Sequence, residues 1–240
     1  MENIEKQALN CGAKIIDENI VSVDFSTSPF TLVSNSNIVY KALTIIICTG
    51  SEPNKLGIDN EDRLWTRGIS SCAVCDGALY KNKNIMVVGG GDSAMEEALF
   101  LTKFSNVMLI HRRDSFRASK IMVDRVINNE KIKIYYNTSI DELIGTNKLE
   151  SVIVKNSTTG IKSKISVDGL FYGLGLKPNT QIFEKYLDID EAGYIRRYRS
   201  VDPTYKTSTS ISGIFVAGDS CDKFYRQAIV ACGDGCKAAL

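Results

Sequence analysis

Short apolar runs and amphipathic stretches alternate through the middle of the chain. Residues 85–88 and 107–110 are uninterrupted apolar runs of strand length, and between them residues 92–104 repeat apolar positions at helical spacing. Continuous apolar runs of this length are typical of strands buried on both faces, whereas a spacing of three and four is typical of a helix packed on one side. The pattern predicts a β-α-β unit, followed by a second helix over residues 115–129.

Further runs rich in strand-forming residues, some of them broken by turn residues, lie outside this unit. They cover residues 14–25, 30–33, 38–48, 132–136, 152–155, 161–167, 170–172 and 214–217. Helical spacing recurs at residues 2–10 and from about Tyr225 to Leu240. Strands that alternate with helices predict the α/β class with a parallel sheet.

Two segments place proline and glycine between apolar blocks. They are SerGluProAsnLysLeuGly, residues 51–57, and GlyLeuLysProAsnThr, residues 175–180. Because these residues interrupt regular structure, both segments are interpreted as linkers. The sequence therefore predicts a middle domain over residues 54–176, flanked by residues 1–53 and 177–240.

Charge and hydropathy exclude several classes of partner. The 240 residues carry a formal net charge of +1, with basic and acidic residues intermixed, so no broad basic field for nucleic acid is expected. The apolar runs are far shorter than the ~20 residues that cross a bilayer. The opening segment MENIEKQALNCG lacks the apolar region and cleavage site of a secretory signal. We expect a cytoplasmic protein, or one of an organellar stroma or matrix, that binds neither nucleic acid nor a membrane.

Seven cysteines in such a chain do not suggest a framework of structural disulfides, because the number is odd and the expected compartment is reducing. Cys11, Cys48 and Cys221 each stand alone in the sequence. The simplest interpretation of each is a small, buried or half-buried apolar residue.

Cys72 and Cys75 are the exception, because two intervening residues let their sulfurs close a disulfide and lower the pKa of one thiol. Asp76 follows directly and is a candidate proton donor or acceptor for a thiolate. A zinc site would need a second ligand pair, and the candidates, Cys232 and Cys236, lie in another segment at helical spacing. A redox dithiol without metal is therefore predicted, with a zinc site and an inert pair as the alternatives.

A glycine-rich turn follows the predicted strand at residues 85–88. Gly89, Gly91 and Ala94 have the spacing of the dinucleotide fingerprint, and Asp92 and Ser93 open the helix that follows. In that fingerprint the glycines allow a tight turn and close approach of a pyrophosphate, which sits against the helix N-terminus. Because strand, turn, helix and second strand occur in order, the turn is predicted to bind a dinucleotide; the alternative is a purely structural turn.

The end of the second strand indicates which dinucleotide binds. Sites specific for NAD place a carboxylate there, about 20 residues beyond the glycines. This sequence has His111, Arg112 and Arg113 at that position, with Arg117 one turn later. Guanidinium groups bind phosphate in a bidentate manner and would attract the 2′-phosphate of NADPH. NADPH is therefore predicted, against the alternative of a solvated basic face, and His111 is expected to contact the adenine or phosphate side rather than act as a general base.

Five motifs occur together in one order. They are CysAlaValCysAspGly (72–77), GlyGlyGlyAspSerAlaMetGluGluAla (89–98), HisArgArgAspSerPheArgAla (111–118), GlyIlePheValAlaGlyAsp (213–219) and TyrArgGlnAla (225–228). With this combination the chain resembles the low-molecular-weight thioredoxin reductases, which are flavoproteins, over nearly all of its residues. The resemblance implies two nucleotide-binding, Rossmann-like domains of three-layer ββα architecture, with an NADPH domain inserted into an FAD domain.

The resemblance also assigns residues to FAD, in the two segments that flank the NADPH domain. These residues are Thr49, Gly50, Gly218, Asp219, Arg226, Gln227 and Ala228. Members of the family begin with a strand and a first Gly-x-Gly-x-x-Gly turn that this sequence lacks. We therefore expect Met1 to lie inside the FAD domain and Leu240 inside its last helix, so that the FAD domain is incomplete and the sequence is truncated at both ends.

The implied activity is that of a thioredoxin-disulfide reductase. Electrons pass from NADPH through FAD to the disulfide of Cys72 and Cys75 and on to thioredoxin, and Asp76 protonates the departing thiolate. A homodimer and a rotation of the NADPH domain about the two linkers are implied as well. The alternatives are a flavoprotein reductase of a peroxiredoxin-type partner and a non-catalytic NADPH-binding redox module.

Overall fold

The computed structural model describes residues 2–198 and 206–240 and divides the chain into two compact units. Residues 52–177 form one unit, here called the inserted unit, and the residues on either side of it together form the outer unit. The divisions fall at Ser51/Glu52 and Lys177/Pro178, beside the boundaries expected at 53/54 and 176/177. Met1 and residues 199–205, which belong to the flanking segments, lie outside the described residues. The two-unit α/β fold expected from the sequence is confirmed.

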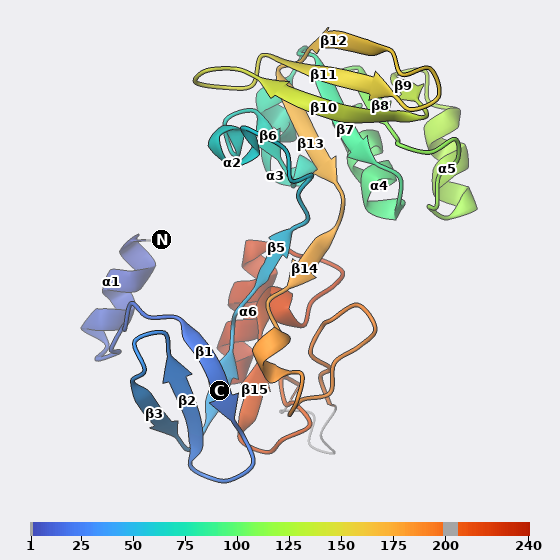
Figure 1. Ribbon diagram of the computed structural model, residues 1–240. Helices are drawn as coiled ribbons and strands as arrows, with labels where there is room; N and C mark the ends of the chain where they lie inside the picture. The colour runs from blue at the N-terminus through green and yellow to red at the C-terminus, as the bar shows by residue number, and fades with distance from the viewer. Residues whose placement is uncertain (1, 199–205) are drawn as a thin grey trace. The chain divides into compact units, whose positions relative to one another are not determined.

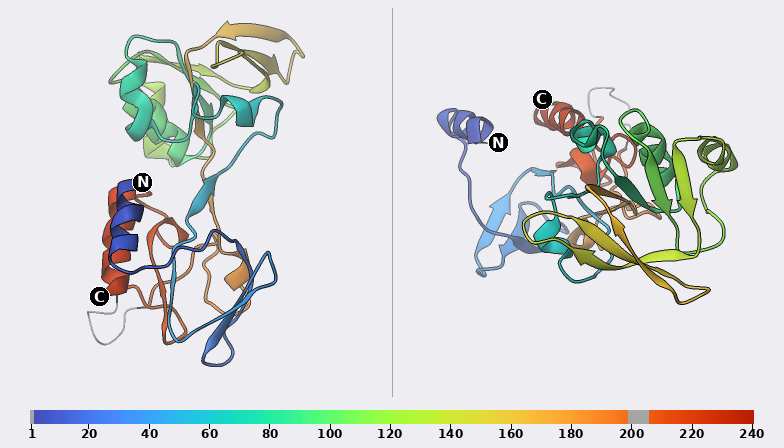
Figure 2. Two further views of the ribbon diagram at one scale, coloured as in Figure 1. Left: turned by 90° about the vertical axis from the view of Figure 1, so that its left-hand side faces the viewer. Right: turned by 90° about the horizontal axis from the view of Figure 1, so that it is seen from above.

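The inserted unit has three layers, which Figures 1 and 2 show from the side and from above. Its centre is a parallel sheet in the order β6 (Ile69–Ser70), β13 (Gly169–Gly173), β7 (Ile85–Gly89), β8 (Val107–Ile110) and β9 (Ile132–Tyr135). Helices α4 (Asp92–Leu101) and α5 (Lys120–Ile127) lie on one face. The other face is covered by an antiparallel sheet of β10 (Thr138–Ile144), β11 (Ser151–Asn156) and β12 (Lys162–Ser166).

Alternation along β7 explains why its sequence is apolar throughout. Ile85 and Val87 pack with the helices in one core cluster, whereas Met86 and Val88 pack with the antiparallel sheet in the other. All four side chains are less than a tenth exposed. A strand covered on both faces has no solvent-facing position, so polar residues are excluded from it.

The outer unit joins segments from both ends of the described chain. Its helices and strands are α1 (Glu2–Asn10), β1 (Ile20–Asp24), β2 (Phe30–Ser34), β3 (Val39–Ala42), β4 (Ile45–Ile47), β15 (Ile214–Val216) and α6 (Ala228–Ala239). Strands β1, β2 and β3 form an antiparallel sheet, and β4 pairs in parallel with β15. Aromatic residues build much of the core, in which Phe25 contacts Phe30 edge-on and stacks on Phe183.

Short elements complete the fold. They are β5 (Ser51–Pro53), α2 (Glu61–Leu64), α3 (Ala73–Asp76), β14 (Leu176–Pro178) and the 3₁₀ turns η1 (Gly77–Tyr80), η2 (Gln181–Phe183) and η3 (Gly218–Ser220). The expected linkers at residues 51–57 and 175–180 are thus not wholly irregular, because β5 and β14 pair with each other. No helix among the described residues is long and apolar enough to cross a membrane.

Three predicted helices are shorter in the structure. For two of them, hydrogen bonds hold the preceding residues outside the helix. The helix expected over 92–104 ends at Leu101, and the one expected over 115–129 spans only Lys120–Ile127. Before α5, the Arg117 N–H donates to the Gly90 carbonyl. The C-terminal helix begins at Ala228 instead of Tyr225, since the preceding residues form a loop closed on the carboxylate of Asp222.

Close contact between α4 and the central sheet depends on glycine. A Cβ atom added to Gly89 or to Gly173 would lie 2.6 Å from the Cβ of Ala94. Ala94, the third residue of the fingerprint, is buried at this contact. The small residues at these three positions therefore allow the helix to begin directly against the carboxyl ends of β7 and β13.

Replacing Gly173 with alanine should destabilise the protein by about 1–3 kcal/mol, the usual cost of overpacking a core. Urea denaturation followed by circular dichroism measures the change. The matched control is Gly233→Ala in α6, where an added Cβ has no atom within 4 Å and the helix should gain roughly 0.5–1 kcal/mol. Equal stability of Gly173→Ala and the unsubstituted chain would contradict the packing described here.

Candidate dithiol and nucleotide sites

Cys72 and Cys75 form a disulfide across the short helix α3. Cys72 is the N-cap of this helix, and its sulfur accepts a hydrogen bond of 3.2 Å from the backbone N–H of Cys75. Cys75 is exposed, whereas Cys72 is half-buried. The two sulfurs therefore differ in accessibility and in their hydrogen bonds.

Asp76 is held beside the dithiol by Ser70, a residue not predicted from the sequence. The Ser70 hydroxyl donates to Oδ2 of Asp76 at 2.7 Å and accepts from the N–H of Cys72 at 3.0 Å. Ser70 lies at the end of β6 and is buried. These two hydrogen bonds connect the carboxylate of Asp76 to the backbone of Cys72 through Ser70, and Asp76 stays the candidate proton donor or acceptor for the dithiol.

The second cysteine pair lies elsewhere. Cys232 and Cys236 are both exposed on α6 in the outer unit, while Cys72 and Cys75 belong to the inserted unit. Within residues 2–198 and 206–240 no group of three or more His, Cys, Asp or Glu side chains is placed to hold a metal ion.

The glycine turn opens into a hollow of about 340 Å³ at the carboxyl ends of β7 and β8. Its lining includes Gly89, Gly90, His111, Arg112, Arg113 and Arg117. A Cβ placed on Gly91 would find nothing closer than the guanidinium of Arg117, at 3.5 Å. The turn therefore faces open space bordered by a cation, which fits a dinucleotide phosphate.

The positive charge of the hollow is uncompensated by neighbouring acids. Arg112, Arg113 and Arg117 are exposed, and none of them forms an ion pair with a described acidic residue. Three unpaired guanidinium groups around one hollow fit the extra phosphate of NADPH. Lys55, Thr138 and Ser139 line the same hollow; they come from distant segments, so no local sequence signal marked them.

His111 packs against the backbone of the glycine turn. Its ring is buried directly under Gly90, where an added Cβ would overlap it, and Nε2 lies 3.0 Å from the Ser115 carbonyl. Burial lowers the pKa of His111, with further lowering by the charges of Arg113 and Arg112. The imidazole packed in this way supports the glycine turn and also lines the hollow.

The stability of the protein should fall as the pH is lowered from about 7, because the unfolded chain protonates His111 near its ordinary pKa of about 6.5. The folded chain binds that proton only at lower pH, since the pKa of His111 is lowered. Urea denaturation at a series of pH values from about 7.5 to about 5 measures the slope. His111→Gln removes the only histidine and should flatten this slope; an unchanged slope would contradict the assignment.

Asp92 ties the two helices of the inserted unit together. Its carboxylate accepts hydrogen bonds from the N–H of Ser119 at 2.9 Å and from the Ser119 hydroxyl at 2.8 Å, and these bonds lower the pKa of Asp92. Ser119 precedes α5 and Asp92 opens α4. Asp92 therefore orients the arginine-bearing segment around the turn, and Ser93 follows it in the first turn of α4.

The residues that the sequence assigned to FAD all lie in the outer unit. Thr49 donates through its hydroxyl to the Asn179 carbonyl at 2.6 Å, and the Asn179 N–H donates to the Gly50 carbonyl at 2.9 Å. Ser51 donates to Oδ2 of Asp219 at 3.3 Å. The structure thus brings the ends of β4 and β15 together, although they are far apart in sequence.

Gly218 and Asp219 follow β15 in the turn η3. Gly218 has a φ of 72°, a left-handed conformation that favours glycine. Asp219 is half-buried, and Ser51 is the partner of its one side-chain hydrogen bond among the described residues. A carboxylate with remaining acceptor positions fits the hydroxyl groups of a flavin ribityl chain.

The segment before α6 is shaped by Asp222, which the sequence did not reveal. Although burial alone would raise its pKa, hydrogen bonds from the N–H groups of Phe224, Tyr225 and Arg226 lower it. Arg226 has a φ of 49°, and its guanidinium folds back onto the Lys223 carbonyl.

Two predicted flavin contacts follow directly after this loop. Gln227 is the N-cap residue of α6, and Ala228 is its first residue. The loop and the helix start are therefore preformed in the chain itself.

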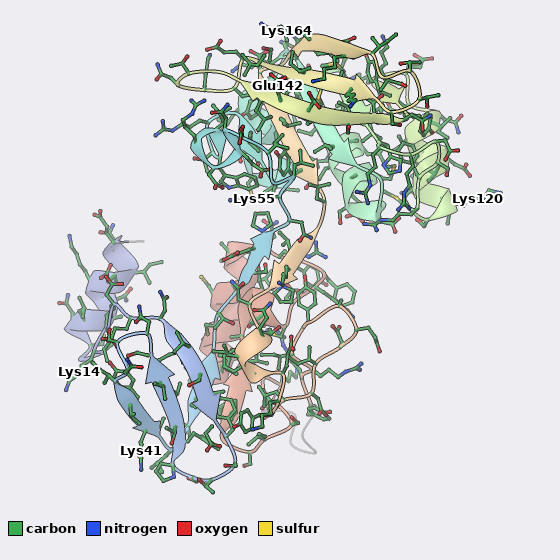
Figure 3. All side chains as sticks on the ribbon, in the orientation of Figure 1. Lys14, Lys41, Lys55, Lys120, Glu142 and Lys164 are labelled. Carbon is green, nitrogen blue, oxygen red and sulfur yellow. A yellow bond between two sulfur atoms is a disulfide. The ribbon has the colours of Figure 1, made fainter. Side chains whose placement is uncertain are left out.

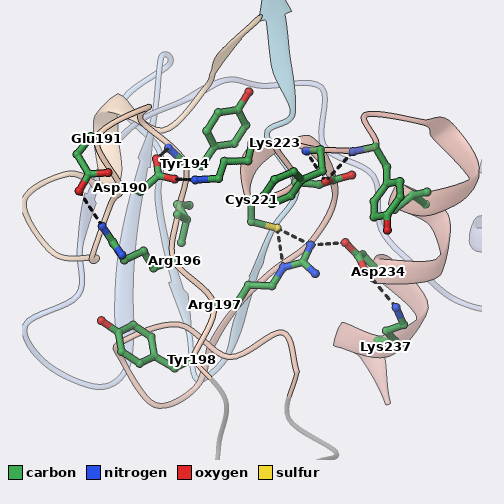
Figure 4. Close-up of a pocket in the computed structure, with 15 residues that line it drawn as sticks. Asp190, Glu191, Tyr194, Arg196, Arg197, Tyr198, Cys221, Lys223, Asp234 and Lys237 are labelled. Carbon is green, nitrogen blue, oxygen red and sulfur yellow. Dashed lines mark hydrogen bonds and ion pairs between the residues drawn. The ribbon is translucent and has the colours of Figure 1, made fainter. Parts of the chain in front are cut away.

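A second polar cluster lies in the outer unit (Figure 4). Arg197 donates to the sulfur of Cys221 through Nε at 3.1 Å and through Nη2 at 2.9 Å, and it forms an ion pair with Asp234 of α6. Burial raises the pKa of Cys221 to about 11. Cys221 therefore accepts these hydrogen bonds as a thiol. The expectation of a buried or half-buried residue is confirmed for Cys221 and wrong for Cys11 and Cys48, which are exposed.

The comparisons with known proteins agree with this geometry. The family model for pyridine nucleotide-disulphide oxidoreductases matches residues 2–235. The chain is 44% identical to thioredoxin reductase of Rickettsia typhi, covering 100% of this chain and 77% of the relative. It is 45% identical to thioredoxin reductase 2 of Arabidopsis thaliana, covering 100% and 64%. The solved thioredoxin reductase of Giardia duodenalis superposes with a TM-score of 0.88 at 42% identity, over 99% of this chain and 77% of that one.

The chain has a disulfide and a glycine-rich turn in one α/β unit, and the family model matches nearly all of its residues. It therefore belongs to the class of pyridine nucleotide-disulphide oxidoreductases. Within that class, the sequence identity to thioredoxin reductases and the share of each chain that is aligned identify the family. The chain belongs to the thioredoxin reductase family and is an oxidoreductase.

Proposed function

We propose that this chain reduces the disulfide of a thioredoxin with electrons from NADPH, as a thioredoxin-disulfide reductase. The observation that carries the proposal is that one unit contains two features. One is an accessible disulfide whose neighbour Asp76 is held by Ser70, and the other is the hollow at the glycine turn, here called the nucleotide hollow, which is lined by arginines without ion pairs. The names of the relatives support the same activity.

Two cofactors belong to the proposal. NADPH would be held by the turn Gly89–Ala94, by His111 and by Arg112, Arg113 and Arg117. FAD would be held by Thr49, Gly50, Gly218, Asp219 and the segment Arg226–Ala228. When bound, they supply the two electrons and the proton chemistry that convert the Cys72–Cys75 disulfide to a dithiol.

The chain's own residues then carry out the exchange with the partner. The exposed Cys75 releases its proton to solvent, its thiolate attacks one sulfur of the partner's disulfide, and the sulfur that leaves takes up a proton from solvent. Cys72 gives its proton to Asp76 and attacks the sulfur of Cys75, which re-forms the Cys72–Cys75 disulfide. The second partner sulfur leaves and is protonated from Asp76. Two electrons and two protons have then passed from the dithiol to the partner.

The proposal extends to the assembly and location of the protein. We place it in a reducing compartment, the cytoplasm or an organellar stroma or matrix, because the five described cysteines outside the pair are free thiols. We also propose a homodimer, in keeping with the family.

The test is a coupled assay in which NADPH oxidation is followed while thioredoxin reduces insulin. Turnover that needs both the chain and thioredoxin supports the proposal. Consumption of peroxide through a peroxiredoxin-type partner, without insulin reduction, would favour the other flavoprotein reductase. If the chain binds NADPH but shows neither a flavin absorption band nor turnover, the result would support the alternative of a non-catalytic NADPH-binding redox module.

A further inference from the structure

A hollow lined by lysines lies at the amino ends of β7, β8 and β9, the opposite end of the sheet from the nucleotide hollow. Its volume is about 470 Å³, and it is here called the lysine hollow. The charged members of its lining are Lys81, Lys83, Lys103 and Lys131, and the described residues that line it include no acidic side chain. The rest of the lining is Asn82, Asn84, Phe104, Ser105 and Asn106.

The four charges are not neutralised within the described part of the chain. None of the four lysines forms an ion pair there. Lys131 donates to the Thr102 carbonyl, and Lys103 lies 4.3 Å from the ring centroid of Phe100. Asp168 lies beside the lining, where its carboxylate accepts a hydrogen bond from the Asn84 N–H. The hollow therefore keeps an excess of positive charge that faces solvent.

The chain leads from the dithiol helix α3 into the lining of the lysine hollow. The turn η1 leads directly from Asp76 to Lys81. A Cβ placed on Gly77 would lie 3.1 Å from the ring of Phe104, and the Asn82 N–H donates to the Phe104 carbonyl at 3.0 Å. The segment that follows the dithiol therefore packs against Phe104, which lines the lysine hollow.

Apolar residues border the exposed sulfur. Val74 is 62% exposed and Leu79 is 69% exposed, on α3 and η1 respectively. An apolar centre beside a charged rim is the composition of a protein–protein interface. A nucleic acid would use the lysines but would have no use for the apolar residues at the disulfide.

We propose that the lysine hollow is the electrostatic docking surface for the redox partner, and that the partner is a thioredoxin whose face around its own disulfide is acidic. The inference rests on the proposed function and adds the charge of its substrate. Opposite charge beside the reacting sulfurs accelerates encounter and orients the partner, and salt weakens the effect.

The experiment measures exchange without either cofactor. The full chain is reduced with dithiothreitol, freed of reductant and mixed with an oxidised thioredoxin that has an acidic active-site face, and the rate constant is recorded at low and high sodium chloride. The test variant is Lys81→Glu with Lys103→Glu. The control is Lys164→Glu, an exposed lysine on β12 (Figure 3). A second probe is the same thioredoxin with its acidic face neutralised to amides.

The double variant should exchange with the acidic thioredoxin about tenfold more slowly at low salt, a loss of steering of the usual size, and the difference should shrink at high salt. Lys164→Glu should match the unsubstituted chain, and the neutralised thioredoxin should not distinguish the variants. All variants should react equally with 2-hydroxyethyl disulfide, a small neutral disulfide, which shows that the dithiol itself is intact.

Equal rates of the double variant and of Lys164→Glu with the acidic thioredoxin would overturn the proposal, as would a loss that salt does not affect. Binding of a labelled oligonucleotide that the double variant loses, with thioredoxin exchange unchanged, would assign the hollow to nucleic acid instead. Because this assay needs neither NADPH nor flavin, failure of NADPH-driven turnover would count against the proposed function and not against this inference.

Discussion

Replacing Cys72 with serine should turn the protein into a trap for thioredoxin. Cys75 is the exposed member of the pair, so it is expected to attack the partner's disulfide, and without Cys72 this chain has no neighbouring thiol that resolves the mixed disulfide. The thioredoxin used has its second active-site cysteine replaced with serine and its first activated as a mixed disulfide with a small aromatic thiol, so that no thiol of thioredoxin reverses the reaction. Non-reducing electrophoresis of the mixture should show a covalent complex that dithiothreitol separates by reducing the mixed disulfide. NADPH-driven turnover should be lost, while NADPH binding measured by fluorescence should be unchanged.

The matched variant is Cys75→Ser. It leaves only the half-buried Cys72 and should capture little thioredoxin, although turnover is lost equally. Cys48→Ser removes an exposed thiol of the outer unit and should change neither capture nor turnover. Stronger capture by Cys75→Ser than by Cys72→Ser would reverse the roles of the two sulfurs.

Replacing Arg112 and Arg113 together with alanine should weaken NADPH binding and leave NADH binding nearly unchanged. A hydrogen bond to a charged group contributes about 1.5–3 kcal/mol, so each arginine that binds the 2′-phosphate is expected to account for a factor of roughly 10 to 100 in affinity. NADH lacks that phosphate and makes no such contact. Titration of both nucleotides by fluorescence measures the ratio.

Lys120→Ala is the control for this experiment, because Lys120 is an exposed cation at the start of α5, in the same unit (Figure 3). It should alter neither affinity. If the double variant weakened NADH and NADPH by the same factor, the arginines would act on the common pyrophosphate or on the fold, and the predicted preference for NADPH would be wrong.

The sequence predicted the centre of the inserted unit well because each of its signals is local. Strand β7 is apolar along its whole length, since both faces are covered, and the glycines of the turn follow it directly. The predicted second strand, residues 107–110, coincides with β8, Val107–Ile110. The thioredoxin reductase family was identified correctly from motifs of the same local kind.

Other elements carried no readable pattern. Strand β10 was not predicted, because a shift in register between Ile140 and Glu142 breaks the alternation that marks a strand. Strand β6 has two residues and owes its place to pairing with β13. Ser70 and Asp222 position the dithiol and the loop before α6, but a single serine or aspartate has no motif, and only the fold shows what each one contacts.

The way the chain divides has a consequence for its synthesis. Residues 52–177 form one contiguous stretch. Its two ends lie side by side, because the Asn54 N–H donates a hydrogen bond of 3.0 Å to the Gly175 carbonyl. All strand partners of the central sheet lie within that stretch, so it can fold on the ribosome as soon as it has emerged. Among the described residues, β4 pairs with β15, with Ile45 beside Ile214, so this pairing must wait until Ile214 has been made. During translation, the inserted unit can therefore carry its dithiol and its arginine-lined hollow in folded form before the pairing of β4 with β15 exists.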